Sequence, residues 1–202
     1  MSTTVKPKGG RPSQGAREAA LAAARDLFIE RDFHLVSTSE ILGRAGISRG
    51  ALYHHFPSKH DLYEAVWMDS ERRLTERLAA RAASATTPLE ALLAAMDGYL
   101  SEAAENVELR RIGLLQSRTV LGWERWRAGI SDIGLAVVSA GLAAAMDAGE
   151  LARADVEATA HLVLAAMIEA ALLIAVADDP DAQRAAAEPT LLAMIDGLRA
   201  QA

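Results

Sequence analysis

Residues 40–59 of this chain have the sequence EILGRAGISRGALYHHFPSK. Ser37, just before them, has Glu40 three positions later, a capping-box spacing that predicts the start of a short helix. Gly46 suits the tight turn that follows, because glycine adopts positive φ without steric cost. Ser48 predicts the N-cap of a second short helix, which ends before the Phe-Pro pair because a residue preceding proline avoids helical backbone. Two short helices joined by a glycine-containing turn form a helix-turn-helix.

Apolar residues at helical spacing lie on both sides of this stretch. From Gln14 to Arg31, Ala, Leu and Phe recur three and four positions apart, which predicts a helix with one buried face. Asp32 stands where that helix ends, and aspartate tolerates the left-handed conformation better than most residues. We expect an all-α chain of about nine or ten helices, with no segment that predicts a strand. The later helices are expected over about 58–82, from Pro88 onwards, and over 107–115, 116–126, 129–148, 155–177 and 181–198, the last disturbed near Pro189.

The composition argues against several classes of protein. Of the 202 residues, 51% are apolar and only 4% are aromatic, which suits packed helices better than sheets. The chain has no cysteine, so it has no disulfide framework, cysteine-based zinc site or thiol nucleophile. The first residues lack the apolar core of a secretory signal. The apolar stretch 158–177 contains a histidine and a glutamate, which argues against a membrane span. We therefore expect a cytoplasmic protein.

The formal net charge of −6 is divided unevenly along the chain. Nine basic and five acidic residues give residues 1–60 a net charge of +4, whereas residues 61–202 carry 12 basic and 22 acidic residues and a net charge of −10. Phosphate binding depends on the local potential within a Debye length rather than on the charge of the whole chain. A basic N-terminal part on an acidic body is therefore compatible with a DNA-binding head and a separate second domain.

Several positions in and around the helix-turn-helix resemble the tetracycline-repressor (TetR) family of bacterial regulators. The resemblance covers about Arg17 to Val66, and residues 120–126 and 169–174 are similar to the C-terminal domains of some members. Asp32, Val36 and Leu42 depart from the family pattern, which usually has glycine, threonine and alanine at these positions. The matching residues are Ala24, Phe28, Gly46, Ile47, Ser48, Leu52, Tyr53, Phe56 and Lys59.

The outer face of the second short helix predicts contacts with DNA. Arg49 can donate two hydrogen bonds to a guanine or reach a phosphate, and Gly50 keeps the helix slim enough to approach the groove. The resemblance implies that Tyr53, His54 and Lys59 contact phosphates. The N-terminus of the preceding helix should contact the phosphate backbone of the DNA beside the recognition site, because the free amides at a helix N-terminus bind anions. The candidate DNA-binding residues are Ser37, Thr38, Ser39, Arg49, Gly50, Ala51, Tyr53, His54, His55 and Lys59, together with Lys8 and Arg11.

Some features of this N-terminal part have two interpretations. The polar arm at residues 1–13, with its basic side chains, either enters the minor groove beside the main site or is a solvated tail. We expect Phe56 in the core, and the Tyr53 ring buried with its hydroxyl turned outward to a phosphate. His54 and His55 diverge by about 100° on a helix, so no metal site is predicted there.

The C-terminal part contains a few polar and aromatic residues that suggest a ligand pocket. Trp123 and Trp126 share one helical face and either pack structurally or line a pocket, since pockets are mostly apolar with a few polar groups. His161 and Glu169 interrupt an apolar helix, and each needs a partner within the fold, across a dimer interface or on a ligand. The candidate ligand-binding residues are Gln116, Trp123, Trp126, His161 and Glu169.

Wide apolar arcs on the two long C-terminal helices predict a homodimer, because one chain cannot cover both faces of each helix. Such a dimer presents two DNA-binding heads to a palindromic operator of double-stranded DNA. The expected organisation is a basic arm at 1–13, a helix-turn-helix domain at 14–60, and a helical effector-binding and dimerisation domain at 61–202.

We therefore expect a sequence-specific transcriptional regulator, a homodimeric repressor that a small-molecule effector releases from its operator. The alternative within this class is a regulator controlled by a protein partner, or an activator. An enzyme is the competing class, but no pattern of catalytic residues, phosphate-binding loop or paired carboxylates supports it. We expect no cofactor, no metal and no membrane partner.

Overall fold

The computed structural model describes residues 14–200, with the side chains of residues 131 and 132 left out. The described residues form helices and no strand; an isolated antiparallel bridge joins Leu151 and Arg199. The prediction of an all-α fold is confirmed. The expected basic arm at 1–13, with Lys8 and Arg11, lies outside the described residues.

Contacts within the chain define two compact units, residues 1–66 and residues 67–202. The division falls within helix α4 (Lys59–Ala82), which begins in the first unit and continues in the second. The boundary expected from the sequence, between residues 60 and 61, lies in the first turn of that helix.

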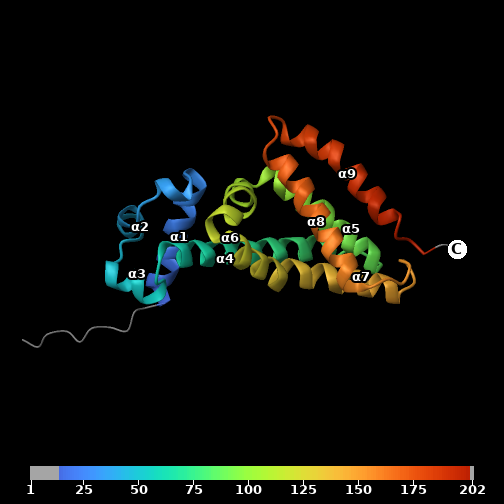
Figure 1. Cartoon of the computed structure of the whole chain (residues 1–202), viewed down its shortest axis with the longest axis horizontal. Helices are drawn as coiled ribbons and strands as arrows, with labels where there is room; N and C mark the ends of the chain where they lie inside the picture. Colours follow the sequence, from blue (N-terminus) through green and yellow to red (C-terminus); the bar gives the residue numbers. More distant parts are fainter. Residues whose placement is uncertain (1–13, 201–202) are drawn as a thin grey trace, which may run out of the picture. The chain divides into compact units, whose positions relative to one another are not determined.

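The N-terminal unit contains α1 (Gln14–Glu30), a turn of 3-10 helix η1 (Phe33–Leu35), α2 (Thr38–Ala45), α3 (Arg49–His55) and the start of α4 (Figure 1). Ser37 and Glu40 form the predicted capping box at α2, and Gly46 after it has φ 65°. The predicted helix-turn-helix is therefore present. Its core consists of Ala20, Leu21, Ala23, Ala24, Leu27, Phe28, Phe33, Val36, Ile41, Leu52, Phe56, Leu62, Tyr63 and Val66.

The turn after α1 differs from the sequence-based expectation. Asp32 has φ −64° and ψ 147°, which is extended backbone rather than the left-handed conformation we expected. The chain instead closes a 3-10 turn, in which the Leu35 amide donates to the Asp32 carbonyl at 2.9 Å. Because this turn needs no positive φ, an aspartate is accommodated without backbone strain.

The C-terminal unit is built around α5 (Pro88–Glu105), which packs against α7 (Ala136–Asp147), α8 (Val156–Ala175) and α9 (Pro180–Asp196). Pro88 occupies the first turn of α5 as predicted, and the Thr87 hydroxyl caps that helix. Helix α9 continues through Pro189. The largest fully buried side chains contributed by α5, α7 and α8 are Met96, Leu100, Leu142 and Ile174.

Between α5 and α7 the helical backbone is more continuous than predicted. A π-helix η2 (Leu109–Gln116), α6 (Ser117–Ile130) and a second π-helix η3 (Ser131–Leu135) follow one another, with one non-helical residue, Gly122, at φ 75° and ψ 168°. The break expected before Gly129 is absent. A Cβ atom at Gly129 would lie 2.5 Å from the Trp67 ring. The glycine therefore allows this ring to pack closely against the helix backbone and does not mark a helix boundary.

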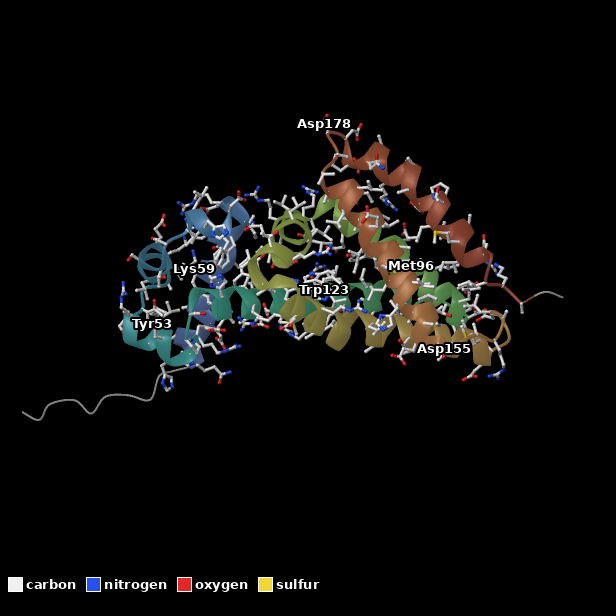
Figure 2. All side chains as sticks on the ribbon, in the orientation of Figure 1. Tyr53, Lys59, Met96, Trp123, Asp155 and Asp178 are labelled. Carbon is white, nitrogen blue, oxygen red and sulfur yellow. The ribbon has the colours of Figure 1, made fainter. Side chains whose placement is uncertain are left out.

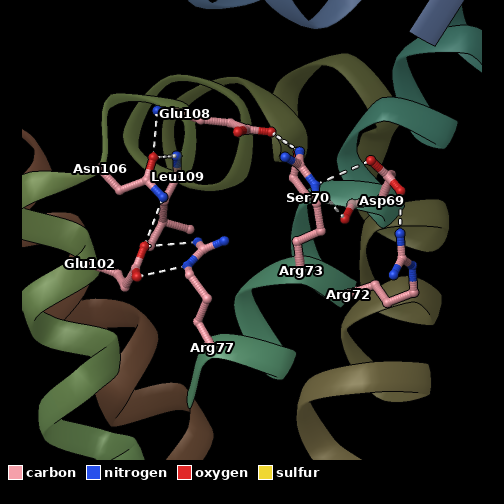
Figure 3. Close-up of polar contacts among 9 residues, drawn as sticks. All are labelled: Asp69, Ser70, Arg72, Arg73, Arg77, Glu102, Asn106, Glu108 and Leu109. Atoms are coloured by element: carbon pink, nitrogen blue, oxygen red, sulfur yellow. Dashed lines mark hydrogen bonds and ion pairs between the residues drawn. The ribbon is translucent and has the colours of Figure 1, made fainter. Parts of the chain in front are cut away.

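A polar cluster ties the second half of α4 to the α5–η2 turn (Figure 3). Arg77 donates to both carboxylate oxygens of Glu102 at 2.8 Å each, and Glu102 also accepts from the Asn106 side chain. The side-chain oxygen Oδ1 of Asn106 in turn accepts from the Glu108 and Leu109 amides, and so caps the helical turn that begins at residue 107. Paired carboxylate–guanidinium bonds of this kind fix the orientation of one helix on another.

Two described stretches, Leu109–Asp147 and Val156–Ala175, are long and apolar enough to cross a membrane by composition. The core helix of a soluble protein meets the same criterion. Helix α8 contributes Leu164, Met167 and Ile174 to the core shared with α5, α7 and α9.

Candidate nucleic-acid interface and candidate ligand cavity

Helix α3 is held by its inner face and leaves its outer face uncovered. The Ser48 hydroxyl caps the helix by accepting from the Ala51 amide at 3.2 Å. Leu52 and Phe56 are buried, as expected. Arg49 and Gly50 are exposed at the start of the helix. A short helix whose inner face is packed on the core and whose outer face is exposed can enter the major groove of DNA without rearrangement.

The start of α3 is small and cationic. A Cβ atom added at Gly50 would meet nothing within 4 Å, so the glycine faces open space. Among the ion pairs of residues 14–200, none involves Arg49, which leaves its guanidinium available to a partner. Ala51 is half-buried beside them.

Tyr53 is placed differently from our expectation. Its side chain is 41% exposed, so the ring is not buried (Figure 2). The reason is the helical rotation of about 100° per residue, which turns position 53 outward when Leu52 fills the core. His54 is also exposed, whereas His55 is half-buried and its Nε2 is enclosed without a hydrogen-bond partner. Tyr53 and His54 thus present polar groups to solvent more fully than His55 does.

Lys59 has an internal role that the sequence did not indicate. Its ammonium donates to the carbonyl oxygens of Phe33 at 2.8 Å and Val36 at 2.9 Å, and lies 4.0 Å from the centre of the Phe33 ring. Burial lowers the pKa of this ammonium below its usual value. An ammonium has three donors, so one N–H remains for a phosphate. Lys59 therefore first ties the start of α4 to the η1 turn.

The N-terminus of α2 is less favourable for binding an anion than the sequence implies, because a carboxylate already occupies its cap. The Ser37 hydroxyl accepts from the Glu40 amide and donates to the Glu40 carboxylate, which also accepts from the Ser37 amide at 2.8 Å. These bonds, together with Arg31 at 2.7 Å, lower the pKa of Glu40 to about 2. A fixed negative charge therefore stands beside Ser37, and the exposed Ser39 and half-buried Thr38 are better placed to meet a phosphate.

One cation near α3 was missed in the sequence analysis. The Arg17 guanidinium, from α1, lies 5.6 Å from the centre of the Phe56 ring at the end of α3. Stacking on an aromatic ring orients a guanidinium and leaves its edge N–H groups free to bind an anion. The sequence contained no signal for this placement, because the two residues are far apart in the chain.

The C-terminal unit contains a first cavity of about 250 Å³, which we call the basic compartment. The two indole rings on α6 lie 5.6 Å apart, and the Arg118 guanidinium stands over both, at 5.2 and 5.3 Å from their centres. Across the cavity, Arg127 approaches Nδ1 of His161 on α8 to 3.0 Å. Its polar and aromatic lining residues are Glu71, Tyr99, Arg118, Trp123, Trp126, Arg127, His161 and Glu169.

A second cavity of about 340 Å³, which we call the aliphatic compartment, adjoins the first. It lies among α4, α5, η3, α7 and α8, and its walls are mainly Ala, Leu, Ile, Val and Met side chains. The two compartments have residues in common, so they are neighbouring parts of one hollow in this unit. The shared lining residues are Glu71, Tyr99, Ile130, Leu164 and Ile168.

Glu71 and Tyr99 stand where the two compartments meet. Burial raises the pKa of the Glu71 carboxyl to about 7, and the hydrogen bond from the Trp67 indole to its Oε1, 3.0 Å long, opposes that rise. Burial also raises the pKa of the Tyr99 phenol above its usual value. Neither residue was a sequence candidate, because their chain positions carry no motif and only the packing of α4 on α5 brings them together.

The structure brings four of the five predicted ligand-binding residues to one cavity, since Trp123, Trp126, His161 and Glu169 all line the basic compartment. Gln116 is buried in η2 and lines neither compartment. Arg118 and Arg127 were missed, although their spacing from the tryptophans was a signal that could have found them. In the part of the chain that the structure describes, no group of three or more His, Cys, Asp or Glu residues is arranged to hold a metal ion.

Two family models match most of the chain. The model described as "Bacterial regulatory proteins, tetR family" matches residues 20–66. The model described as "Tetracyclin repressor-like, C-terminal domain" matches residues 89–198, more than half of the chain.

Curated relatives match mainly the N-terminal unit. The transcriptional activator FasR of Mycolicibacterium smegmatis is 40% identical over 67 residues, which cover 30% of this chain and 31% of the relative. The chain thus spans about a third of the length of the curated relatives that it matches first.

Solved structures resemble the chain over nearly its full length. A TetR-family transcriptional regulator from Pectobacterium atrosepticum is 30% identical with a TM-score of 0.79, covering 92% of this chain and 94% of that one. The regulator FadR of Bacillus subtilis, solved with stearoyl-CoA, has a TM-score of 0.71 at 20% identity, covering 86% and 96% of the two chains. At that identity, the likeness to FadR concerns the fold alone.

Proposed function

This chain belongs to the TetR family of bacterial transcriptional regulators, and on that premise we propose that it is a cytoplasmic homodimeric repressor released from a palindromic operator by a small molecule. Members of this family bind DNA through a helix-turn-helix, carry a ligand-binding C-terminal domain and typically dimerise. The protein would act as a regulator and not as an enzyme.

The proposal that the protein binds DNA depends on one observation. The inner face of α3 is packed on the core, and its outer face exposes an arginine without an ion-pair partner beside a glycine. Arg49 would read a base edge in the major groove, with Gly50 and Ala51 allowing close approach. Phosphates would be contacted by Thr38, Ser39, Tyr53, His54 and the third N–H donor of Lys59. Ser37 and His55 would have lesser roles, and Arg17 joins the predicted residues as a further phosphate contact. Lys8 and Arg11 remain proposed minor-groove contacts.

The proposed dimer uses the outer faces of α8 and α9. Helix α8 has exposed residues three and four positions apart, which form one stripe along the helix. Leu162 is 72% exposed, and Leu173, Val176 and, on α9, Met194 are exposed as well. Exposed apolar side chains aligned in this way mark an interaction surface. A second copy is the natural occupant, because dimerisation is typical of the family and places two DNA-binding heads about a two-fold axis.

Release by a ligand would follow from differential binding. A molecule in the hollow of the C-terminal unit would favour the conformation that holds it best, and operator affinity falls if that conformation spaces the two α3 helices unsuitably. The proposal is supported by FadR of Bacillus subtilis, a regulator of similar fold that was solved in complex with stearoyl-CoA. The second candidate is an activator, since the relative FasR is named an activator.

The test is selection of bound duplexes from random DNA with the purified protein, followed by affinity measurements on the selected site. Arg49→Ala should weaken operator binding by roughly 1–3 kcal/mol and relax the preference at one base position. Arg153→Ala, at an exposed arginine of the C-terminal unit, is the matched control and should bind as the wild type does. A protein that prefers no duplex over random competitor, or an Arg49→Ala variant with unchanged affinity and preference, would contradict the proposal.

A further inference from the structure

The hollow in the C-terminal unit has two chemically different ends. The basic compartment contains two guanidinium groups and two indole rings, while the aliphatic compartment is almost entirely hydrocarbon. We propose that the effector is an amphipathic anion whose head binds Arg118 and Arg127 and whose unbranched aliphatic chain fills the aliphatic compartment. This inference rests on the proposed function and gives its effector a chemical class.

The charges of the basic compartment are not balanced by protein carboxylates. Among the ion pairs of the described residues, none involves Arg118 or Arg127. Glu169 is the one carboxylate at this end of the hollow away from the junction, and among the described residues no ion pair joins it to either guanidinium group. An anionic head would supply the missing partner, and it would form charge-assisted hydrogen bonds with both arginines.

The orientation of Arg127 supports a binding role. Its Nη2 lies 3.0 Å from His161 Nδ1, and because a guanidinium only donates, that imidazole nitrogen is the acceptor. In this contact the imidazole offers Arg127 a lone pair and not a negative charge. The histidine positions the guanidinium while its other N–H groups stay available to a ligand. The two indole rings hold Arg118 in a similar way through their faces.

The aliphatic compartment selects the other half of the ligand. Apart from Glu71, Thr75 and Tyr99, its lining residues are apolar, and no phenylalanine or tryptophan stands among them to stack on an aromatic ligand. The Thr75 hydroxyl already donates to the Glu71 carbonyl at 3.0 Å, so it does not call for a ligand partner. Small residues such as Ala91, Ala95 and Gly141 leave the space open. An alkyl chain fits such walls, because its transfer from water is favourable in proportion to the area buried.

The experiment compares four ten-carbon probes that differ in the head group: decanoate, decyl phosphate, decanol and decyltrimethylammonium. Binding to the full chain is measured by calorimetry and by the change in tryptophan fluorescence, with Trp123 and Trp126 as reporters beside the head. We expect at least one of the anions to bind at least tenfold more tightly than decanol, and the cation to bind most weakly. Which anion binds better distinguishes a carboxylate from a phosphate head. Equal binding of decanol, tighter binding of the cation, or binding of none of the four would overturn the proposal.

Two variants test the two ends separately. Arg127→Gln should reduce the preference for the anion over decanol at least fivefold, while Arg153→Gln, at an exposed arginine that lines neither compartment, should leave it unchanged. Ala95→Leu fills part of the aliphatic compartment and should shift the best ligand to a shorter chain, with roughly a fourfold loss for each methylene that no longer fits. Melting curves of each variant verify that it is folded. The assignment is contradicted if Arg127→Gln leaves the preference for the anion over decanol unchanged. It is also contradicted if a folded Ala95→Leu variant has the same dependence of affinity on chain length as the wild type.

The failure of this inference is distinguishable from failure of the proposed function. A protein that binds a selected operator but none of the probes is a regulator with a different effector. A protein that binds decanoate as described but prefers no DNA sequence keeps the ligand assignment and loses the function.

Discussion

Replacing Glu71 with glutamine should stabilise the C-terminal unit at high pH and change it little at low pH. The Glu71 carboxyl is enclosed where the two compartments meet, and burial raises its pKa from 4.5 to about 7. Glutamine has nearly the same shape and keeps a carbonyl oxygen that accepts from the Trp67 indole. The substitution therefore removes the ionisation while preserving the packing.

The sign and size of the effect follow from proton linkage. Between pH 4.5 and about 7 the folded protein binds more protons than the unfolded one, so the free energy of unfolding falls as the pH rises through that range. Each pKa unit is worth about 1.4 kcal/mol, which gives an upper limit of roughly 3 kcal/mol lost above pH 7. Glutamine does not titrate, and the Glu71→Gln variant should lack this loss.

Urea unfolding followed by tryptophan fluorescence measures the effect, because all three tryptophans of the chain lie in the C-terminal unit. The wild type and the variant are compared at about pH 5 and about pH 8, because most of the stability that the wild type loses is lost between these two values. Glu76→Gln, on the same helix but 63% exposed and paired with Arg72, is the matched control. A difference between Glu71→Gln and the wild type that is the same at both pH values would refute the reasoning.

Two other substitutions test packing and assembly. Gly129→Ala should cost about 1–3 kcal/mol of unfolding free energy, because the new Cβ would lie 2.5 and 2.6 Å from atoms of the buried Trp67 ring; Gly43→Ala, with nothing within 4 Å, should not destabilise, and equal stability of the two variants would contradict this prediction. Leu162→Glu should convert the dimer into monomers in sedimentation velocity, whereas Leu35→Glu, at an equally exposed leucine of the N-terminal unit, should remain dimeric. If both variants sediment as dimers, α8 does not form the interface.

The helix-turn-helix could be predicted from sequence because its determinants are local. Ser37 and Glu40 satisfy each other's donors over three positions, and Gly46 and Ser48 set the turn and the next cap in the same way. The caps of the later helices followed the same logic, as with Pro88 at the start of α5. Interactions within a few residues are visible in the order of the residues themselves.

Local signals failed where distant packing competes with them. Gly129 looked like a helix boundary, but the nearness of the Trp67 ring assigns it to a close contact within a continuing helix, and the break moves to Gly122. Tyr53 looked like a core aromatic until the placement of Leu52 turned it outward. Asp32 needed no left-handed backbone once a 3-10 turn was available.

The order of residues was sufficient for the fold class and the DNA-binding motif. It also singled out the tryptophans, the histidine and the glutamate that line the basic compartment, but it left open whether they pack or bind a ligand. Glu71 and Tyr99 became candidates only when α4 and α5 were seen to meet at one hollow. The physical reason is that a cap or a turn is made by neighbours in the chain, whereas the water-poor surroundings that raise the pKa of Glu71 are made by helices distant in sequence.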